Sequence, residues 1–221
     1  MKIQINKSKF RVACAAASIL ALTYSSEAAT TSFAFTTDTA FSYTGAAVIG
    51  EATDVWAQWT VGNAGPTPIA NGISATVSGA TDEIYYGGVT FETYSEILQQ
   101  YIYSSSTLTI VLSGLDSSLF YNVVGIASLD DYFNADIKTF AAVGFNTVSG
   151  TLTNNSSATS FSSGVNFATL SSVQPTATGV ITLTVATDVG INALQIAAVP
   201  EPSVIVMLSF VGLGCLARRK R

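Results

Sequence analysis

The chain contains no histidine, and its two cysteines, Cys14 and Cys215, both lie in apolar segments near the ends of the sequence. Residues 29–198 therefore contain neither an imidazole nor a thiol. This excludes disulfides, Ser-His-Asp and Cys-His nucleophile systems, zinc sites with nitrogen and sulfur ligands, and histidine-carboxylate iron sites. A glycine-rich phosphate loop of the expected spacing is also missing. Carboxylates and other oxygen ligands are the chemistry that remains.

Positive charge is equally scarce between the two ends. Lys138 is the only basic residue in residues 29–198, against twelve acids, so this body carries a net charge of −11 although the whole chain carries −5. Nothing in the body could neutralise phosphates, which excludes nucleic acid as a partner. Binding to bare anionic lipid is excluded for the same reason.

The amino terminus has the features of an export signal. A basic stretch is followed by the apolar run 12–22 and by Ser26-Glu27-Ala28, whose small residues are of the kind that a signal peptidase reads. We therefore expect residues 1–28 to be a signal peptide that directs the chain to the Sec translocon. Cleavage is expected between Ala28 and Ala29.

The carboxyl terminus combines three features in a fixed order. Val199-Pro200-Glu201-Pro202-Ser203 comes first, and its prolines favour an extended, accessible stretch. The apolar run 204–217 follows, and its 14 residues would span about 21 Å as a helix, short of a hydrocarbon core of about 30 Å. The cluster Arg218-Arg219-Lys220-Arg221 ends the chain and is expected on the cytoplasmic side. A tail-anchored single span is the alternative interpretation.

This order of motif, apolar helix and basic cluster resembles the PEP-CTERM sorting signal of Gram-negative envelope proteins. The resemblance implies transient anchoring in the inner membrane through residues 199–221 and cleavage near Pro200-Glu201-Pro202 by an exosortase-type enzyme. It implies that the body, residues 29–198, then reaches the cell surface or extracellular matrix. There it would have a structural or adhesive role linked to extracellular polysaccharide.

The body has the pattern of an all-β protein. In 107–112 and 180–185, apolar residues alternate with others at a period of two, which is typical of strands with one buried face. Such short strands separated by turn residues indicate a single β-sandwich. The predicted strands are 55–61, 73–77, 107–112, 121–127, 139–145, 180–185 and 191–196.

Two segments depart from this pattern. Apolar residues in 94–103 follow a helical period, and Thr93 and Glu96 have capping-box spacing, so we expect one short helix lying across one end of the sandwich. The segment 148–164 is rich in serine, threonine and asparagine. It is interpreted either as edge strands or as a flexible loop.

A second resemblance comes from two stretches of the body. Leu112-Ser113-Gly114-Leu115-Asp116 followed by Phe120-Tyr121-Asn122-Val123, together with Gly190-Ile191-Asn192-Ala193-Leu194-Gln195-Ile196, resembles the jelly-roll, galactose-binding-like bodies that precede PEP-CTERM tails. Fibronectin-type sandwiches use a similar turn and tyrosine. The resemblance implies a jelly-roll-like sandwich, and carbohydrate binding follows from it only by analogy of fold.

A lectin-like module is therefore the first alternative function. Trp56 and Trp59, with Gln58 between them, are the candidate carbohydrate contacts. Because they are three residues apart, one strand would place them on opposite faces. We expect at most one of the two in the core, which would leave the other available for a sugar.

An acidic loop offers a candidate metal site. Asp130, Asp131, Asn134 and Asp136 place four oxygen-bearing side chains directly after a predicted strand, and such a loop could supply several ligands of a structural Ca²⁺. No EF-hand spacing is present. Solvated loop acids are the alternative, and no other cofactor is expected.

A polysaccharide hydrolase that uses two carboxylates is the second alternative. Such enzymes need two carboxyl groups across a cleft at about 5 to 9.5 Å. Acids are available, but nothing in the sequence pairs any two of them. The body also lacks histidine and arginine to orient a substrate, so the sequence favours a protein that is not an enzyme.

Overall fold

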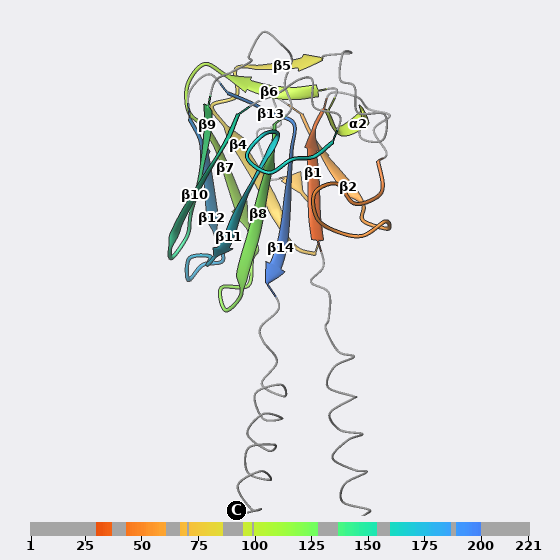
Figure 1. Cartoon of the computed structure of the whole chain (residues 1–221). Helices are drawn as coiled ribbons and strands as arrows, with labels where there is room; N and C mark the ends of the chain where they lie inside the picture. The colour runs from red at the N-terminus through yellow and green to blue at the C-terminus, as the bar shows by residue number, and fades with distance from the viewer. Residues whose placement is uncertain are drawn as a thin grey trace, which may run out of the picture. The chain divides into compact units, whose positions relative to one another are not determined.

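The computed structural model describes residues 30–36, 43–60, 67–69, 71–85, 95–98, 100–127, 137–153, 160–186 and 189–199. All of them lie within one compact unit, Ala29–Val199. Strands dominate this unit (Figure 1), which confirms the predicted all-β sandwich. The expected signal helix and C-terminal helix lie outside the described residues. Within those residues, no helix has the length and apolarity that crossing a membrane requires.

Two sheets form the sandwich. The first has five strands in the order β11-β8-β14-β1-β2, and the second has six in the order β10-β9-β12-β7-β4-β3. The strands of the first sheet are β1 (Thr30–Phe35), β2 (Trp56–Trp59), β8 (Phe120–Ile126), β11 (Phe167–Val173) and β14 (Ala193–Val199). Those of the second are β3 (Thr67–Pro68), β4 (Ser74–Ser78), β7 (Leu108–Ser113), β9 (Ile137–Val143), β10 (Thr147–Thr153) and β12 (Ile181–Val185).

The connectivity is that of a jelly roll. Eight strands wind between the two sheets to give β1-β14-β8-β11 facing β7-β12-β9-β10. The segment between β1 and β7 adds β2 to the edge of one sheet, and β4 and β3 to the edge of the other. β2 pairs with β1 in parallel, whereas the other neighbours are antiparallel. The predicted jelly-roll-like sandwich is thus confirmed.

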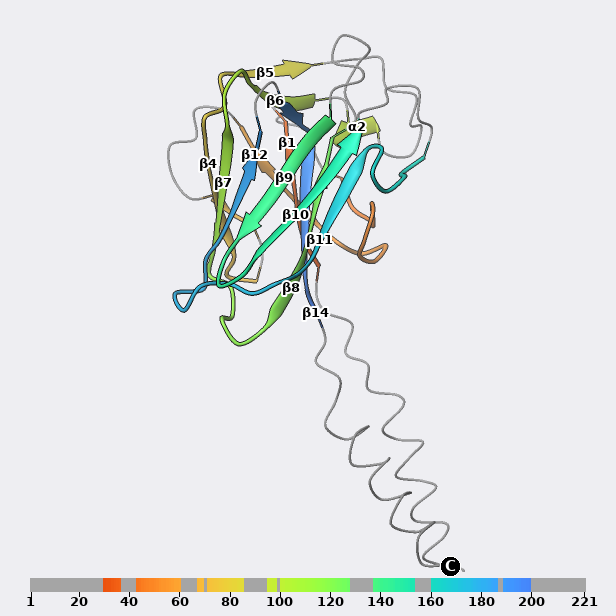
Figure 2. The ribbon, with the colours of Figure 1, turned by 60° about the vertical axis from the view of Figure 1, so that its left-hand side comes forward.

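A small third sheet lies across one end of the sandwich (Figures 1 and 2). It consists of β13 (Val189–Ile191), β6 (Gln100–Ser104) and β5 (Asp82–Tyr85), in that order, and α2 (Ser95–Leu98) precedes β6. The helix predicted over 94–103 is therefore wrong in its second half. Tyr101 and Ile102 are adjacent and both buried, because β6 is covered on both faces and paired on both edges. Strand pairing at this position outweighs the helical period of the sequence.

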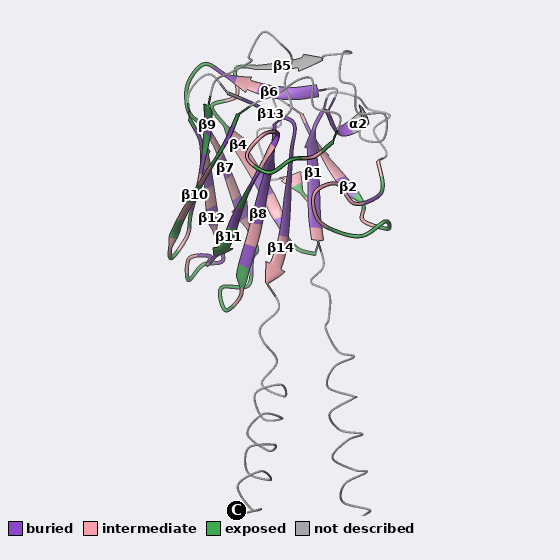
Figure 3. Cartoon of the chain, in the orientation of Figure 1, coloured by how far each residue is buried: buried purple, intermediate pink, exposed green. Residues whose placement is uncertain are grey.

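The main core lies between the two large sheets (Figure 3). The alternating residues of β7 and β12 point inward as predicted, and Ile110 and Leu183, which are paired in register, are fully buried. β10 forms the outer edge of the six-stranded sheet. This agrees with the edge-strand interpretation of the start of the segment 148–164, whereas residues 154–159 lie outside the described part of the chain.

A second core covers the outer face of the five-stranded sheet. The segment 43–55 folds over this face, and residues of α2 and of the stretch before β11 join it. Its buried members are Ala34, Trp56, Ile97, Leu98, Val124, Ile126 and Ala193. The central strands of this sheet are consequently buried on both faces.

Candidate functional site

The two tryptophans proposed as carbohydrate contacts are both buried. Trp56 is 5% exposed and Trp59 is 3% exposed. They do lie on opposite faces of β2, but the expectation that at most one is in the core is wrong. The physical reason is the second core: Trp56 belongs to it, whereas Trp59 belongs to the main core. Neither ring presents a surface on which a sugar could stack.

The two indole groups differ in their polar contacts. The Nε1 of Trp56 donates a hydrogen bond to the carbonyl oxygen of Gly45 at 2.9 Å, and its ring packs edge-on against Tyr43. Trp59 packs edge-on against Phe35, and its buried Nε1 has no hydrogen-bond partner among the described residues. Trp56 thus holds the segment 43–55 on the sheet. Gln58, between them, donates from Nε2 to the carbonyl oxygen of Thr36 at 2.8 Å.

The polar residues of the stretch Gly190–Ile196 hold the fold together. Gln195 is fully buried on the outward side of β14. Its Oε1 accepts from the backbone amides of Val48 and Ile49 at 2.9 and 3.1 Å, and its Nε2 donates to the carbonyl oxygen of Ile49 at 2.7 Å and to Ser32 Oγ at 3.1 Å. One amide side chain therefore fixes the segment 43–55 onto the five-stranded sheet.

Asn192 does the same for the small third sheet. It lies between β13 and β14 and is fully buried. Its Nδ2 donates to the carbonyl oxygens of Leu98 and Gln100 at 3.1 and 2.9 Å. Since α2 ends at Leu98 and β6 begins at Gln100, this side chain satisfies the connection between them. Both Asn192 and Gln195, the polar side chains of this stretch, thus have structural roles.

The turn between β7 and β8 is built in the same way. The backbone amide of Asp116 donates to the hydroxyl of the buried Tyr121 at 3.0 Å. The carboxylate of Asp116 accepts from the hydroxyl of Ser118 at 2.7 Å and from its backbone amide at 2.9 Å. These two hydrogen bonds hold the pKa of Asp116 below its usual value, and the bond from the hydroxyl has the larger effect. Asp116 therefore acts as the cap of a turn.

Two acidic side chains in the described part of the chain, Asp54 and Asp116, stabilise turns. Asp54 accepts a hydrogen bond from the backbone amide of Glu51 at 2.9 Å, and so stabilises the turn 51–54. Asp116 stabilises the β7–β8 turn. The side chains of Asp82 and Glu83 lie outside the described part. The hydrolase alternative stays a hypothesis.

The proposed calcium ligands Asp130, Asp131, Asn134 and Asp136 all lie outside the described residues. Among the residues that are described, no group of three or more acidic residues could hold a metal ion. Calcium binding by the loop 130–136 accordingly stays a prediction. The sorting motif is described only at Val199, the last residue of β14; Pro200 to Ser203, the basic cluster 218–221 and the cleavage site at Ala28 and Ala29 lie outside.

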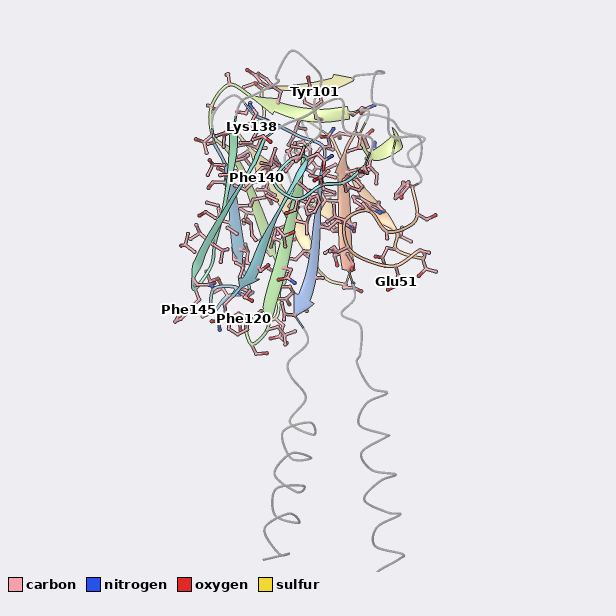
Figure 4. All side chains as sticks on the ribbon, in the orientation of Figure 1. Glu51, Tyr101, Phe120, Lys138, Phe140 and Phe145 are labelled. Atoms are coloured by element: carbon pink, nitrogen blue, oxygen red, sulfur yellow. The ribbon has the colours of Figure 1, made fainter. Side chains whose placement is uncertain are left out.

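Lys138, the one basic residue of the body, is only 1% exposed. It lies on the inward face of β9, on the same side as Phe140 and near the end of the sandwich that carries the small sheet (Figure 4). Its burial leaves the exposed surface of the described residues without any lysine or arginine. This surface is therefore negatively charged or neutral throughout.

The outer face of the six-stranded sheet is neutral and rich in hydroxyl groups, a feature that the sequence analysis did not identify. Pairing in register places Ser149, Ala141, Thr184, Thr109 and Ser78 in one row across the sheet. Other outward positions of β10 and β4 are Thr147, Thr151, Thr153, Ser74 and Thr76. No charged side chain occurs on these strands at an outward position. Alternation of serine and threonine at every second position was the available signal.

The end of the sandwich opposite the small sheet carries exposed aromatic side chains. Phe145, in the turn between β9 and β10, is 80% exposed, and Phe120, the first residue of β8, is 42% exposed. Both lie at the end where β14 finishes (Figure 4). The sequence offered no signal for these two, since an isolated phenylalanine in an all-β protein is usually a core residue.

Comparison with known proteins adds little. No family model matches the chain, and no curated protein matches it. Among solved structures, the plant receptor-like kinase FER is similar at 13% identity with a TM-score of 0.39, over 79% of this chain. The chain spans 43% of the length of that protein. A likeness this distant carries no argument, and the class of this protein, a jelly-roll β-sandwich, follows from its own strand order.

Proposed function

We propose that this chain is an exported envelope protein that is sorted and cleaved through its PEP-CTERM-like tail. Its body then has a structural or adhesive role in a matrix of extracellular polysaccharide. In this proposal the tail holds the protein briefly in the inner membrane, and an exosortase-type enzyme acts near Pro200-Glu201-Pro202. The body is thereby delivered to the cell surface or the extracellular matrix.

The observation that carries the proposal is the point at which the fold ends. β14 runs to Val199, whose partner in register is Phe120, and Pro200 follows immediately. β1 begins at Thr30, two residues after the expected signal cleavage. The described jelly roll therefore lies entirely between the two expected processing sites. Cleavage at both would release a body that keeps all of its described strands.

The surface of the body supports an adhesive or structural role. Serine and threonine hydroxyls both donate and accept hydrogen bonds, as the hydroxyls of a neutral polysaccharide do. The hydroxyl-rich outer face of the six-stranded sheet offers many such groups without charge. The burial of both tryptophans removes the support for a lectin site at Trp56 and Trp59, and the turn-capping roles of the described acids give no support to a hydrolase.

Replacement of Pro200, Glu201 and Pro202 by alanine tests the sorting step. The chain would be expressed in a cell that has an exosortase-type enzyme, and its membrane-bound and released fractions would be measured by immunoblot. We expect the triple variant to accumulate uncleaved in the membrane. Ser209→Ala, within the apolar run, is the control and should be processed normally. Unchanged processing of the triple variant would contradict the proposal.

A glycan array tests the adhesive role. The folded body, residues 29–198, would be applied with and without Ca²⁺. Saturable binding to a polysaccharide supports adhesion, and binding that requires Ca²⁺ would also support the proposed ligand loop 130–136. A blank array with a folded body supports a structural role without specific recognition.

A further inference from the structure

Exposed apolar side chains are concentrated at one end of the sandwich. The described residues include five large hydrophobic side chains that are exposed, and three of them, Phe120, Val143 and Phe145, belong to the end where β14 finishes. Phe120 is paired in register with Val199, the first residue of the sorting motif. Val143 ends β9, and Phe145 follows it in the next turn. These three residues are called the apolar tip below.

The apolar tip is held in place by a network of hydrogen bonds. The backbone amide of Phe145 donates to the carbonyl oxygen of Gln174 at 2.8 Å. Asn146 donates from Nδ2 to the carbonyl oxygen of Ser172 at 2.9 Å and accepts at Oδ1 from the amide of Gln174 at 2.7 Å. The amide of Ser172 in turn donates to Asn122 Oδ1 at 3.2 Å. The turn that carries Phe145 is thereby connected to the strand that carries Phe120.

Ser172 marks a bulge within this network. Its φ angle is 58°, and the pairing of β11 with β8 shifts between Leu170 and Val173. A non-glycine residue in this conformation is uncommon and needs support from its surroundings. Asn122, on β8, and Asn146, in the turn between β9 and β10, supply that support. Phe145 is therefore exposed on a turn that hydrogen bonds hold in place.

The length of the tail limits how far this end can lie from a membrane. Only Pro200 to Ser203 separate Val199 from the apolar run that begins at Val204. Five residue steps, fully extended, span at most about 18 Å. This step rests on the proposed function, in which the run 204–217 is inserted in the bilayer. If the run is inserted, Val199 lies at most about 18 Å from the boundary of the hydrocarbon core. Phe120 is its partner on the neighbouring strand and therefore lies only one strand spacing further away at most.

We propose that the apolar tip inserts into the headgroup region of the membrane that holds the tail. The partner is the surface of a zwitterionic bilayer, because the described part of the body has no exposed cation and Asp116 lies in the turn just before Phe120. Anionic lipid would repel this end. Insertion of the two phenylalanine rings buries apolar area and restricts the orientation of the body, with the small sheet facing away from the membrane.

Tryptophan replacement with membrane-bound quenchers tests this proposal. The full-length chain would be reconstituted into phosphatidylcholine vesicles, with and without bromine on the acyl chains near the headgroups. Phe145→Trp reports on the apolar tip. Ile137→Trp is the matched control, because Ile137 is 67% exposed at the other end of the same strand, about 20 Å from Val143. The parent chain corrects for the buried Trp56 and Trp59.

We expect bromine to quench the added indole of Phe145→Trp at least about threefold more strongly than that of Ile137→Trp, since side chains in the interface lie about 5–10 Å deep. Equal quenching in the two variants overturns the proposal. Quenching of the Phe145→Trp variant that appears only with the processing enzyme present also overturns it and indicates a protein partner. Quenching that depends on the number of protein molecules per vesicle indicates that the apolar tip contacts a second copy of the chain. This result also overturns the proposal.

A flotation measurement on the same vesicles separates this inference from the proposed function. If the chain does not float with the vesicles, the tail is not an anchor and both proposals fail. If the chain floats but the indole added by Phe145→Trp is not quenched, only the contact of the apolar tip is wrong. Circular dichroism and the melting temperature of both variants confirm that the jelly roll is intact.

Discussion

Trp56 and Trp59 lie on opposite faces of one four-residue strand, and each fills a different hydrophobic core. Both are buried but only one is hydrogen-bonded through its indole N–H, so substitutions at the two positions can be compared directly. Trp56 donates to Gly45, whereas the indole N–H of Trp59 has no partner among the described residues. The indole N–H of Trp56 therefore helps to hold the segment 43–55 in place. The indole N–H of Trp59 makes no comparable contribution to the main core.

Replacement of each tryptophan by phenylalanine should separate these contributions. Both variants lose ring volume in a packed site, so both should be destabilised. Trp56→Phe also leaves the carbonyl oxygen of Gly45 without its donor, and we expect it to cost about 1–2 kcal/mol more than Trp59→Phe. Denaturant unfolding of the two variants measures the difference. Equal losses, or a larger loss for Trp59→Phe, would contradict the assignment.

Gln195 should be worth more to stability than an ordinary polar residue. Gln195→Ala leaves the backbone groups of Val48 and Ile49 without their partner, and we expect a loss of about 2 kcal/mol. Hydrogen exchange of the Val48 and Ile49 amides should accelerate more than that of β7 or β12. Gln174→Ala, at a half-buried position, is the control and should change the free energy of unfolding by less than about 0.5 kcal/mol. Unaltered exchange at Val48 and Ile49 would sink this prediction.

Two glycines with similar backbone angles should respond differently to alanine. Gly114 has a φ of 84° and Gly72 a φ of 77°, so alanine is strained at both. At Gly114 an added Cβ would also collide with the backbone carbonyl oxygen of Gly72, whereas at Gly72 the space is open.

We expect Gly72→Ala to lower the free energy of unfolding by about 1 kcal/mol. Gly114→Ala should lower it by about 3 kcal/mol or more, because the backbone at Gly114 or at Gly72 must also move to relieve the collision. Thermal unfolding monitored by circular dichroism compares the two variants. A similar melting temperature for both would show that the β7–β8 turn can shift to accommodate a side chain.

The sequence predicted strands best where one face is buried. β7 and β12 have a buried apolar residue at every second position, and both were predicted to within a residue or two. β1 was not predicted, because almost every one of its residues is buried, including Thr31 and Ser32, and a strand covered on both faces has no period of two. β6 was predicted as helix because it is also covered on both faces: the adjacent residues Tyr101 and Ile102 are both buried, so the strand shows no period of two.

The environment of polar and aromatic residues was harder to predict than the strands. Trp56 is buried by a segment that folds back over the sheet, and nothing local to the strand indicates this cover. Asn192 and Gln195 contact residues more than ninety positions away in the sequence. Such partners become visible only once the strand order is known. Phe145 is a further case: the predicted strand 139–145 included it, but β9 ends at Val143 and Phe145 is exposed in the turn that follows.

Asp116 should titrate below its unperturbed value. Hydrogen bonds from the hydroxyl and then from the backbone amide of Ser118 stabilise its carboxylate and lower its pKa from 3.8. Its pKa is thus lower in the folded state than in the unfolded state. The stability from this difference is fully present above the unfolded-state pKa of about 3.9 and is lost as the pH falls through the folded-state pKa.

Carbon-detected NMR titration of the Asp116 carboxyl group measures this pKa directly. Ser118→Ala removes the hydroxyl bond but keeps the backbone amide, so the pKa of Asp116 should rise part of the way towards 3.8. In the same variant, the loss of melting temperature between pH 5 and acid pH should be smaller. Asp116→Asn is the control, because it removes the titration altogether. A pKa at or above 3.8, or one that Ser118→Ala leaves unchanged, would show that the turn is held by its backbone alone.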